Sequence, residues 1–215
     1  MIDFASAAPV AGDLDVHWIH GHRPGTADTD PAFQVHAYDE HTYVLRQSKA
    51  STYEAPFIYL LFGNERAVLF DSGATKTPDV VSAVDEVMRG WLSRNPRDGY
   101  PLVVAHTHSH GDHVAGDEQF GGRPDTTVVG RTVAEVREFF GFTNWPGEVV
   151  GFDLGGRVLE LTGIPGHHAA SVAVYDPWSG FLLTGDTVYP GRLYAFGSMP
   201  RMPGMSSAGS PGRAR

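Results

Sequence analysis

Four potential metal ligands lie within six consecutive positions near the middle of the chain. His108, His110, Asp112 and His113 form the pattern His-x-His-x-Asp-His. Side chains two positions apart on an extended backbone point the same way, so we expect His108 and His110 to reach one cation. The chain then turns, and we expect Asp112 and His113 to reach a second position close by. Imidazoles and carboxylates are ligands that Zn²⁺ accepts where thiolates are absent.

The chain has 11 histidines and no cysteine. The absence of cysteine removes disulfides, thiolate metal sites and cysteine nucleophiles together, so any metal must be held by His, Asp and Glu. His106 lies further back in the preceding strand, where a hydrogen-bonded core role is the better interpretation, and it is left out of the metal set.

Two further candidates follow expected strands downstream. His167 sits in the turn Ile-Pro-Gly-His, where one imidazole can project toward the same pocket, and His168 is a competing candidate. Asp186 sits in Leu-Thr-Gly-Asp-Thr, where a carboxylate can bridge two cations. Each alone is more often a turn or capping group. Together with the first cluster they favour a shared metal site.

Short β-type runs alternate with two helical patterns along the chain. The helical pattern after Thr77 predicts a helix that Thr77 caps, with Pro78 at its first position and its end near residues 90–94. Thr132 and Glu135 form a capping box that opens a second helix, running to about Phe140. Strands are expected at residues 33–36, 42–46, 57–62, 67–70, 102–105, 127–129, 149–152, 158–162, 172–175 and 181–183. This interleaving favours a mixed-sheet α/β sandwich.

Length and composition predict one globular domain with two appendages. The chain has 215 residues, a size at which one core is well supported. Residues 1–32 lack a clear period and suit an extended arm, and residues 33–196 form the expected domain. Residues 197–215 consist of Gly, Ser, Pro, Met, Arg and Ala, which cannot bury a core face, so we expect a disordered tail.

The formal net charge of −9 argues against nucleic acid as a partner, because such binding depends on Lys and Arg neutralising phosphates. No apolar run approaches the roughly 20 residues that span a bilayer, and the N-terminus lacks the features of a signal peptide. We therefore expect a cytoplasmic protein with a small-molecule substrate and no membrane partner. The sequence carries no signal for an oligomeric state.

The combined motifs resemble the metallo-β-lactamase-fold hydrolase superfamily, in its glyoxalase II and lactonase-like branch. The resemblance rests on four segments, namely Asp71-Ser72-Gly73, the histidine cluster, Pro165-Gly166-His167 and Gly185-Asp186-Thr187. It spans residues 33–196 and implies an αββα sandwich of two mixed β-sheets flanked by helices. The metal pocket is then expected at one edge of the paired sheets.

The resemblance also implies a role for each ligand. His108, His110 and His167 would hold a first Zn²⁺, and Asp112 and His113 a second. Asp186 would bridge the two ions, and Asp71 would support the site from beneath.

In one respect the sequence departs from the family pattern, which continues past the bridging aspartate to a final histidine. No histidine follows His168 in this chain. The expected fold therefore has an incomplete second half, the second metal site is expected to be under-ligated, and the chain resembles a C-terminally truncated member.

The predicted reaction is hydrolysis of a small ester, thioester or lactone by a metal-bound hydroxide. Asp112 would orient the nucleophile and accept its proton. Tyr189, three residues after Asp186, has the spacing at which lactone-cleaving relatives carry a tyrosine that hydrogen-bonds the substrate carbonyl, and a packed loop aromatic is an equal alternative. Arg192 is the obvious local candidate for binding a carboxylate of a glutathione thioester.

Two alternatives to the zinc hydrolase stay open. The first is a mononuclear iron oxygenase that resembles persulfide dioxygenases and uses His108, His110 and a third ligand. The second is a truncated, inactive homologue in which the second sheet is left uncovered.

Overall fold

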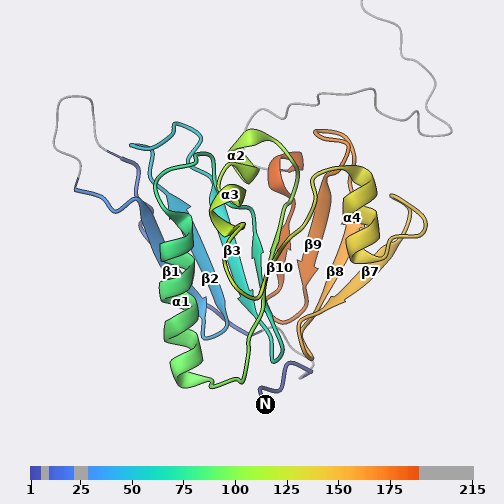
Figure 1. Cartoon of the computed structure of the whole chain (residues 1–215), viewed down its shortest axis with the longest axis horizontal. Coiled ribbons are helices and arrows are strands. Elements are labelled where there is room, and N and C mark those ends of the chain that lie inside the picture. The colour runs from blue at the N-terminus through green and yellow to red at the C-terminus, as the bar shows by residue number, and fades with distance from the viewer. Residues whose placement is uncertain (6–9, 22–28, 189–215) are drawn as a thin grey trace, which may run out of the picture.

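Two β-sheets packed face to face make up the centre of the molecule (Figure 1). The structure is a computed structural model and describes residues 1–5, 10–21 and 29–188. The predicted tail at residues 197–215 and the candidate residues Tyr189 and Arg192 lie outside the described residues. The boundaries of the arm and of the domain stay predictions.

The first sheet has six strands in the order β1-β2-β3-β4-β5-β6. β1 to β4 are antiparallel neighbours, whereas β4, β5 and β6 are parallel. A parallel neighbour needs a long crossover, which the helix α1 supplies between β4 and β5. The strands are β1 (Phe33–Asp39), β2 (Thr42–Gln47), β3 (Phe57–Phe62), β4 (Ala67–Phe70), β5 (Leu102–Ala105) and β6 (Thr126–Val128).

The second sheet has four strands in the order β10-β9-β8-β7, and all of its pairings are antiparallel. They are β7 (Val149–Asp153), β8 (Val158–Gly163), β9 (Val172–Asp176) and β10 (Phe181–Leu183). The αββα class predicted from the sequence is confirmed. Of the two sheets expected to be mixed, the first is mixed, and the described strands of the second are antiparallel because short turns join consecutive strands.

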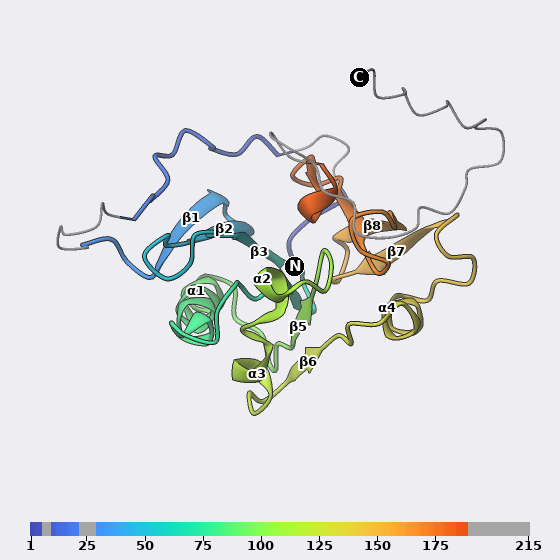
Figure 2. The same cartoon turned by 90° about the horizontal axis from the view of Figure 1, so that it is seen from above.

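Two longer helices lie beside the sheets, and Figure 2 shows them on the same side of the molecule, away from the N-terminal arm. α1 (Val80–Arg94) packs on the outer face of the first sheet, and α4 (Val133–Phe140) packs beside β7. The predicted capping box of Thr132 and Glu135 forms at the start of α4.

The predicted cap of the first helix is wrong. α1 begins at Val80, and its N-cap is Asp79, whose side chain accepts a hydrogen bond from the Ser82 N–H at 3.0 Å. Aspartate caps at least as well as threonine, and it lies two residues beyond Thr77. Pro78 therefore precedes the helix and does not begin it.

Three short helical turns were not predicted, and all of them lie near the candidate ligands. They are α2 (Gly111–Val114), α3 (Asp117–Phe120) and a 3₁₀ turn at Gly185–Thr187. A single turn is too short to show a helical hydrophobic period, so sequence patterning gives no signal for it.

The hydrophobic core fills the space between the sheets and the space under α1. All residues of β4 and β5 are buried, because α1 covers one face of these strands and the second sheet covers the other. In β8, Leu159 and Leu161 point into the core and Val158 points outward. Val149, Val158 and Tyr175 are exposed on the outer face of the second sheet.

A buried arginine joins the two sheets. Arg157, directly before β8, donates to the carbonyl oxygens of His41 and Phe62 at 2.8 and 3.1 Å, both at the first sheet. It also pairs with Asp176 of β9 and donates to the hydroxyl of Thr42 at 2.7 Å.

No helix among the described residues is long and apolar enough to cross a membrane.

Candidate metal centre

The ends of three strands bring the sequence-predicted ligands to one place. His108 and His110 follow β5 of the first sheet, while His167 follows β8 and Asp186 follows β10 of the second. The cluster therefore lies at one edge of the sandwich, between the two sheets.

Three imidazole nitrogens converge on a common point. Nε2 of His108 lies 3.1 Å from Nδ1 of His110, and the same His110 atom lies 2.9 Å from Nε2 of His167. Nitrogens that share a tetrahedral zinc ion at about 2.0–2.1 Å stand about 3.3 Å apart, so this donor set fits such an ion. His108 and His167 are buried, and His110 is half-buried.

A second set of ligand atoms adjoins the first. Ligand atoms of His108, Asp112 and His113 all lie within 4.8 Å of one another. Nε2 of His113 lies 3.3 Å from Oδ2 of Asp112 and 3.3 Å from Oδ1 of Asp186. The other Asp186 oxygen, Oδ2, lies 3.8 Å from Nε2 of His167. The Asp186 carboxylate thus lies between the two groups.

Asp71 supports the cluster from the end of β4. It accepts hydrogen bonds from the Thr107 N–H at 2.8 Å and hydroxyl at 2.9 Å, and from Nδ1 of His113 at 2.8 Å. Its backbone φ is +69°, a left-handed conformation that costs a non-glycine residue of order 1–3 kcal/mol. These bonds hold Asp71 in this conformation and fix the orientation of the His113 ring.

His106 takes part in a separate buried network behind the ligands. Its Nε2 donates to Oδ1 of Asp117 at 2.9 Å, and the Ser72 hydroxyl donates to the same oxygen at 2.7 Å. Arg131 pairs with the other Asp117 oxygen at 2.7 Å. This network fastens α3 to β4 and β5, and His106 lies outside both groups of ligand atoms.

The electrostatics of the cluster favour neutral imidazoles at His108 and His110, and the carboxylates around His113 attract a cation, which can be a proton on His113 or a metal ion in its place. Burial and the charge of His113 lower the pKa of His108 to about 3. Burial and His167 also lower the pKa of His110. Burial opposes protonation of His113, but the Asp71 charge and bonds to Asp112 and Asp186 outweigh it and raise its pKa to about 12. Neutral imidazole is the form that binds metal.

The structure distinguishes between the two histidines that the sequence left in competition. His167 contributes its nitrogen to the converging trio. Nδ1 of His168 instead accepts a hydrogen bond from the Ala170 N–H at 3.1 Å.

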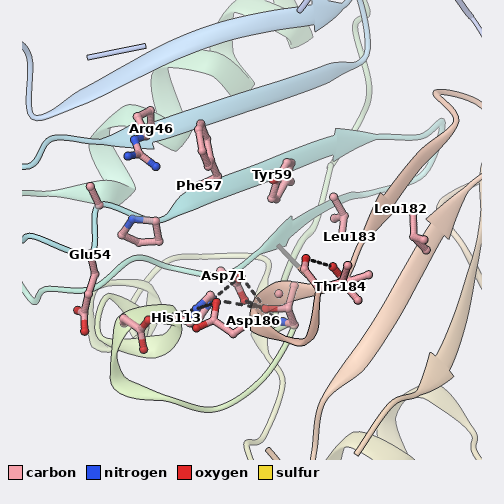
Figure 3. Close-up of a pocket in the computed structure, with 16 residues that line it drawn as sticks. Arg46, Glu54, Phe57, Tyr59, Asp71, His113, Leu182, Leu183, Thr184 and Asp186 are labelled. Atoms are coloured by element: carbon pink, nitrogen blue, oxygen red, sulfur yellow. Dashed lines mark hydrogen bonds and ion pairs between the residues drawn. The ribbon is translucent and has the colours of Figure 1, made fainter. Parts of the chain in front are cut away.

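A cavity of about 530 Å³ opens beside the cluster (Figure 3). Its polar end is formed by side chains of the metal centre, and its walls are largely apolar. The lining residues are Arg46, Glu54, Ala55, Pro56, Phe57, Tyr59, Asp71, Thr107, Asp112, His113, Leu182, Leu183, Thr184, Gly185, Asp186 and Val188.

Sequence reasoning missed the polar residues that β2, β3 and the loop between them contribute to this cavity. They are Arg46, Glu54 and Tyr59. Burial and the Asp71 charge raise the pKa of Tyr59 to about 12, so its hydroxyl stays protonated near neutral pH. The available signal was a charged residue, Arg46, two positions from buried Val44 and on the same side of the strand.

The chain belongs to the metallo-beta-lactamase superfamily, whose family profile matches residues 52–212. Among curated proteins, it is 35% identical over 138 residues to a hydroxyacylglutathione hydrolase of Synechococcus sp. (strain JA-3-3Ab), covering 63% of this chain and 50% of that protein. It is 32% identical over 127 residues to the hydroxyacylglutathione hydrolase of Rhizobium meliloti (strain 1021), covering 57% and 47%. The chain spans about half the length of the curated relatives it matches.

Solved structures share the fold at low sequence identity. A metallo-beta-lactamase from Hirschia baltica superposes with a TM-score of 0.53 at 14% identity, covering 75% of this chain and 74% of that one. DIM-1 metallo-beta-lactamase gives a TM-score of 0.51 at 16% identity, covering 74% and 72%. At these identities the similarity extends to the fold alone.

Proposed function

We propose that this chain is a metal-dependent hydrolase that cleaves a small thioester, with small esters and lactones as substrates of the same reaction. The observation that carries the proposal is the convergence of ring nitrogens from His108, His110 and His167. The similarity to hydroxyacylglutathione hydrolases supports a thioester as the first substrate class.

The proposed metal is zinc, bound at two positions. His108, His110 and His167 are the proposed ligands of the first ion, Asp112 and His113 those of the second, and Asp186 the carboxylate shared between them. Nitrogen and oxygen donors in a chain without cysteine suit this ion. The second ion is expected to bind more weakly, because Asp112 and His113 offer it fewer donors of its own.

When bound, the metal lowers the pKa of a coordinated water toward about 7 and polarises the scissile carbonyl. Burial alone would raise the pKa of Asp112, but the bond and charge of His113 outweigh it and lower that pKa to about 2. The Asp112 carboxylate is therefore ionised at neutral pH. Its proposed role is to accept a hydrogen bond from the attacking water, orient it and take its proton.

Tyr189 is the proposed hydrogen-bond donor to the substrate carbonyl, on the strength of its spacing from Asp186. The variant Tyr189→Phe is expected to lower kcat by about 10²-fold, because one donor to the developing oxyanion is lost. Metal analysis of the same variant is expected to give an unchanged metal content. A variant with unaltered kcat would assign Tyr189 to loop packing.

The test of the proposed function is turnover by the zinc-loaded chain on three matched chromogenic substrates, an S-acyl thioester, the corresponding ester and a lactone. The variant His110→Ala is expected to lose the first metal ion and activity on all three. Its control is His168→Ala, since this neighbouring histidine lies outside both groups of ligand atoms.

Two results would contradict the proposal. One is an unchanged metal content in His110→Ala. The other is tight metal binding by the wild-type chain without turnover of any of the three substrates. Iron in the purified chain together with oxygen consumption would assign the site to the oxygenase alternative.

A further inference from the structure

The cavity beside the metal centre has two polar ends with an apolar stretch between them. Asp71, Asp112 and Asp186 surround His113 at one end, and Arg46 lies at the other (Figure 3). Figure 3 shows Arg46 reaching from the first sheet into the cavity, on the side opposite His113 and Asp186, with Phe57 and Tyr59 beside it. A molecule whose carbonyl lies at the metal centre therefore has a cationic group facing its far portion.

The guanidinium of Arg46 stacks on an aromatic ring and forms no ion pair within the described part of the chain. It lies over the ring of Phe57, with its central carbon 4.4 Å from the ring centroid. Its buried Nε has no hydrogen-bond partner, and the arginines that form ion pairs among the described residues are Arg66, Arg123, Arg131 and Arg157. A buried polar group without a partner is unfavourable, and a bound acceptor removes that cost.

The charge of this group persists at working pH. Burial lowers the pKa of Arg46, but an arginine in a protein stays protonated under ordinary conditions. Stacking on Phe57 restricts the direction in which the planar guanidinium presents its N–H groups. Two parallel N–H groups of a guanidinium form a fork that matches the two oxygens of a carboxylate.

We propose that Arg46 binds a carboxylate of the substrate, at the end of the molecule remote from the scissile carbonyl. This inference rests on the proposed function and narrows its substrate class to thioesters or esters whose acyl or leaving portion ends in a carboxylate. Arg46 lies outside residues 52–212, the segment that the family profile matches.

A carboxylate fits the surroundings better than a phosphate. Glu54, Asp112 and Asp186 all line the cavity, and Figure 3 shows Glu54 extending toward the side of His113 and Asp186, away from the guanidinium of Arg46. One arginine balances the single charge of a carboxylate, whereas a phosphate would carry about two charges toward these carboxylates. The chain as a whole has a net charge of −9, so an anionic substrate needs a local cation to be retained.

The test compares two p-nitrophenyl esters of equal length, one ending in a carboxylate (the glutarate monoester) and one ending in the corresponding carboxamide. In the zinc-loaded full chain, Arg46→Gln is expected to raise KM for the carboxylate ester at least tenfold and to change KM for the carboxamide less than twofold. Arg46→Lys is expected to recover part of the loss, because it keeps the charge but not the fork. Glu54→Gln is expected to lower KM for the carboxylate ester.

The control variant is Arg66→Gln. Arg66 lies at the other end of β3 in the turn before β4, also carries a buried Nε without a partner, and does not line the cavity. It is expected to leave both KM values unchanged. Equal changes for the two esters in Arg46→Gln, or no change for either, would overturn the assignment of Arg46.

A binding measurement separates failure of this inference from failure of the proposed function. Calorimetric titration of the zinc-loaded chain with glutarate and with butyrate is expected to give tighter binding of glutarate, and Arg46→Gln is expected to remove the difference. If no ester is turned over but this selectivity is found, the hydrolase proposal fails and the Arg46 site stands. If both acids bind equally to the wild-type chain, the Arg46 site fails. Inorganic phosphate that displaces glutarate with higher affinity would also overturn the choice of a carboxylate.

Discussion

Asp71 shows how one side chain can fix the orientation of a neighbouring imidazole, that of the proposed ligand His113. Its carboxylate accepts a bond from Nδ1 of His113 and two from Thr107, so the ring of His113 presents Nε2 to Asp112 and Asp186. A residue that orients a metal ligand in this way typically contributes 10- to 100-fold to metal affinity.

The variant Asp71→Asn tests this role. Asparagine tolerates the left-handed backbone conformation and has the same size, but it cannot supply the negative charge that faces His113. We expect the second ion to bind 10- to 100-fold more weakly and the first ion to be little affected. Zinc titration against a chromophoric chelator measures the affinity of the chain for each of the two ions. Equal weakening of the two ions would indicate a general loss of structure.

The Asp117 carboxylate makes the free energy of unfolding depend on pH in the acid range. Burial would raise its pKa, but bonds from His106, Ser72 and Arg131 outweigh burial and lower it. A carboxylate whose folded pKa lies below its unfolded value of about 3.9 stabilises the folded state above that value, and this stabilisation is lost as the pH falls through the folded pKa.

The variant Asp117→Asn is therefore expected to lower the free energy of unfolding by about 1–3 kcal/mol near neutral pH. The difference from the wild-type chain is expected to shrink below about pH 4, where the wild-type carboxylate also becomes neutral. Urea unfolding from pH 3 to pH 7 measures both quantities. A difference that stays constant over this range would contradict a role for the Asp117 charge.

At the scale of elements, Gly116 sets how closely α2 and α3 approach the end of β4. A Cβ atom at Gly116 would lie 2.3 Å from the carbonyl oxygen of Ser72. The two segments are held together at this point, because the Ser72 N–H donates to the His113 carbonyl at 2.8 Å and the Ala115 N–H to the Gly73 carbonyl at 3.1 Å. The short helix that carries Asp112 and His113 is thus positioned by backbone contacts.

Gly116→Ala is expected to destabilise the chain by about 1–3 kcal/mol, the usual cost of forcing extra atoms into a packed site. Gly122→Ala is the matched control, since a Cβ at Gly122 meets nothing within 4 Å. Thermal unfolding of the two variants measures the difference. A Gly116→Ala variant as stable as the control would show that α2 shifts freely.

The sequence predicted the elements well where local patterning decides them. Apolar runs between turn residues marked the strands, and the capping box at Thr132 marked α4. Single turns such as α2 carry no period, and near Asp79 two capping residues competed. The histidines around His110 were found because they are neighbours in sequence, whereas Arg46 becomes a neighbour of the metal centre only once the sheet has formed.

At the scale of the whole molecule, Arg157 links the two sheets: its charge pairs with Asp176 of the second sheet, and its other N–H groups bind to the first sheet at His41, Thr42 and Phe62. Arg157→Ala is expected to destabilise the chain by about 3–5 kcal/mol, because the Asp176 charge stays buried without its partner. The double variant Arg157→Met with Asp176→Leu is expected to be the more stable of the two, since it leaves no unpaired charge. Urea unfolding of both variants measures the free energies. A double variant less stable than Arg157→Ala would contradict this account.

The proposed metal ligands are divided between the sheets, with His108 and His110 on the first and His167 and Asp186 on the second. An ion held by donors from both halves is lost when the halves separate, so unfolding releases it. Above its dissociation constant, each tenfold rise in free zinc is expected to add about 1.4 kcal/mol to the unfolding free energy. A melting temperature that does not change with the free zinc concentration would contradict this linkage. Where the linkage holds, metal supply governs how much of the chain survives in its native form.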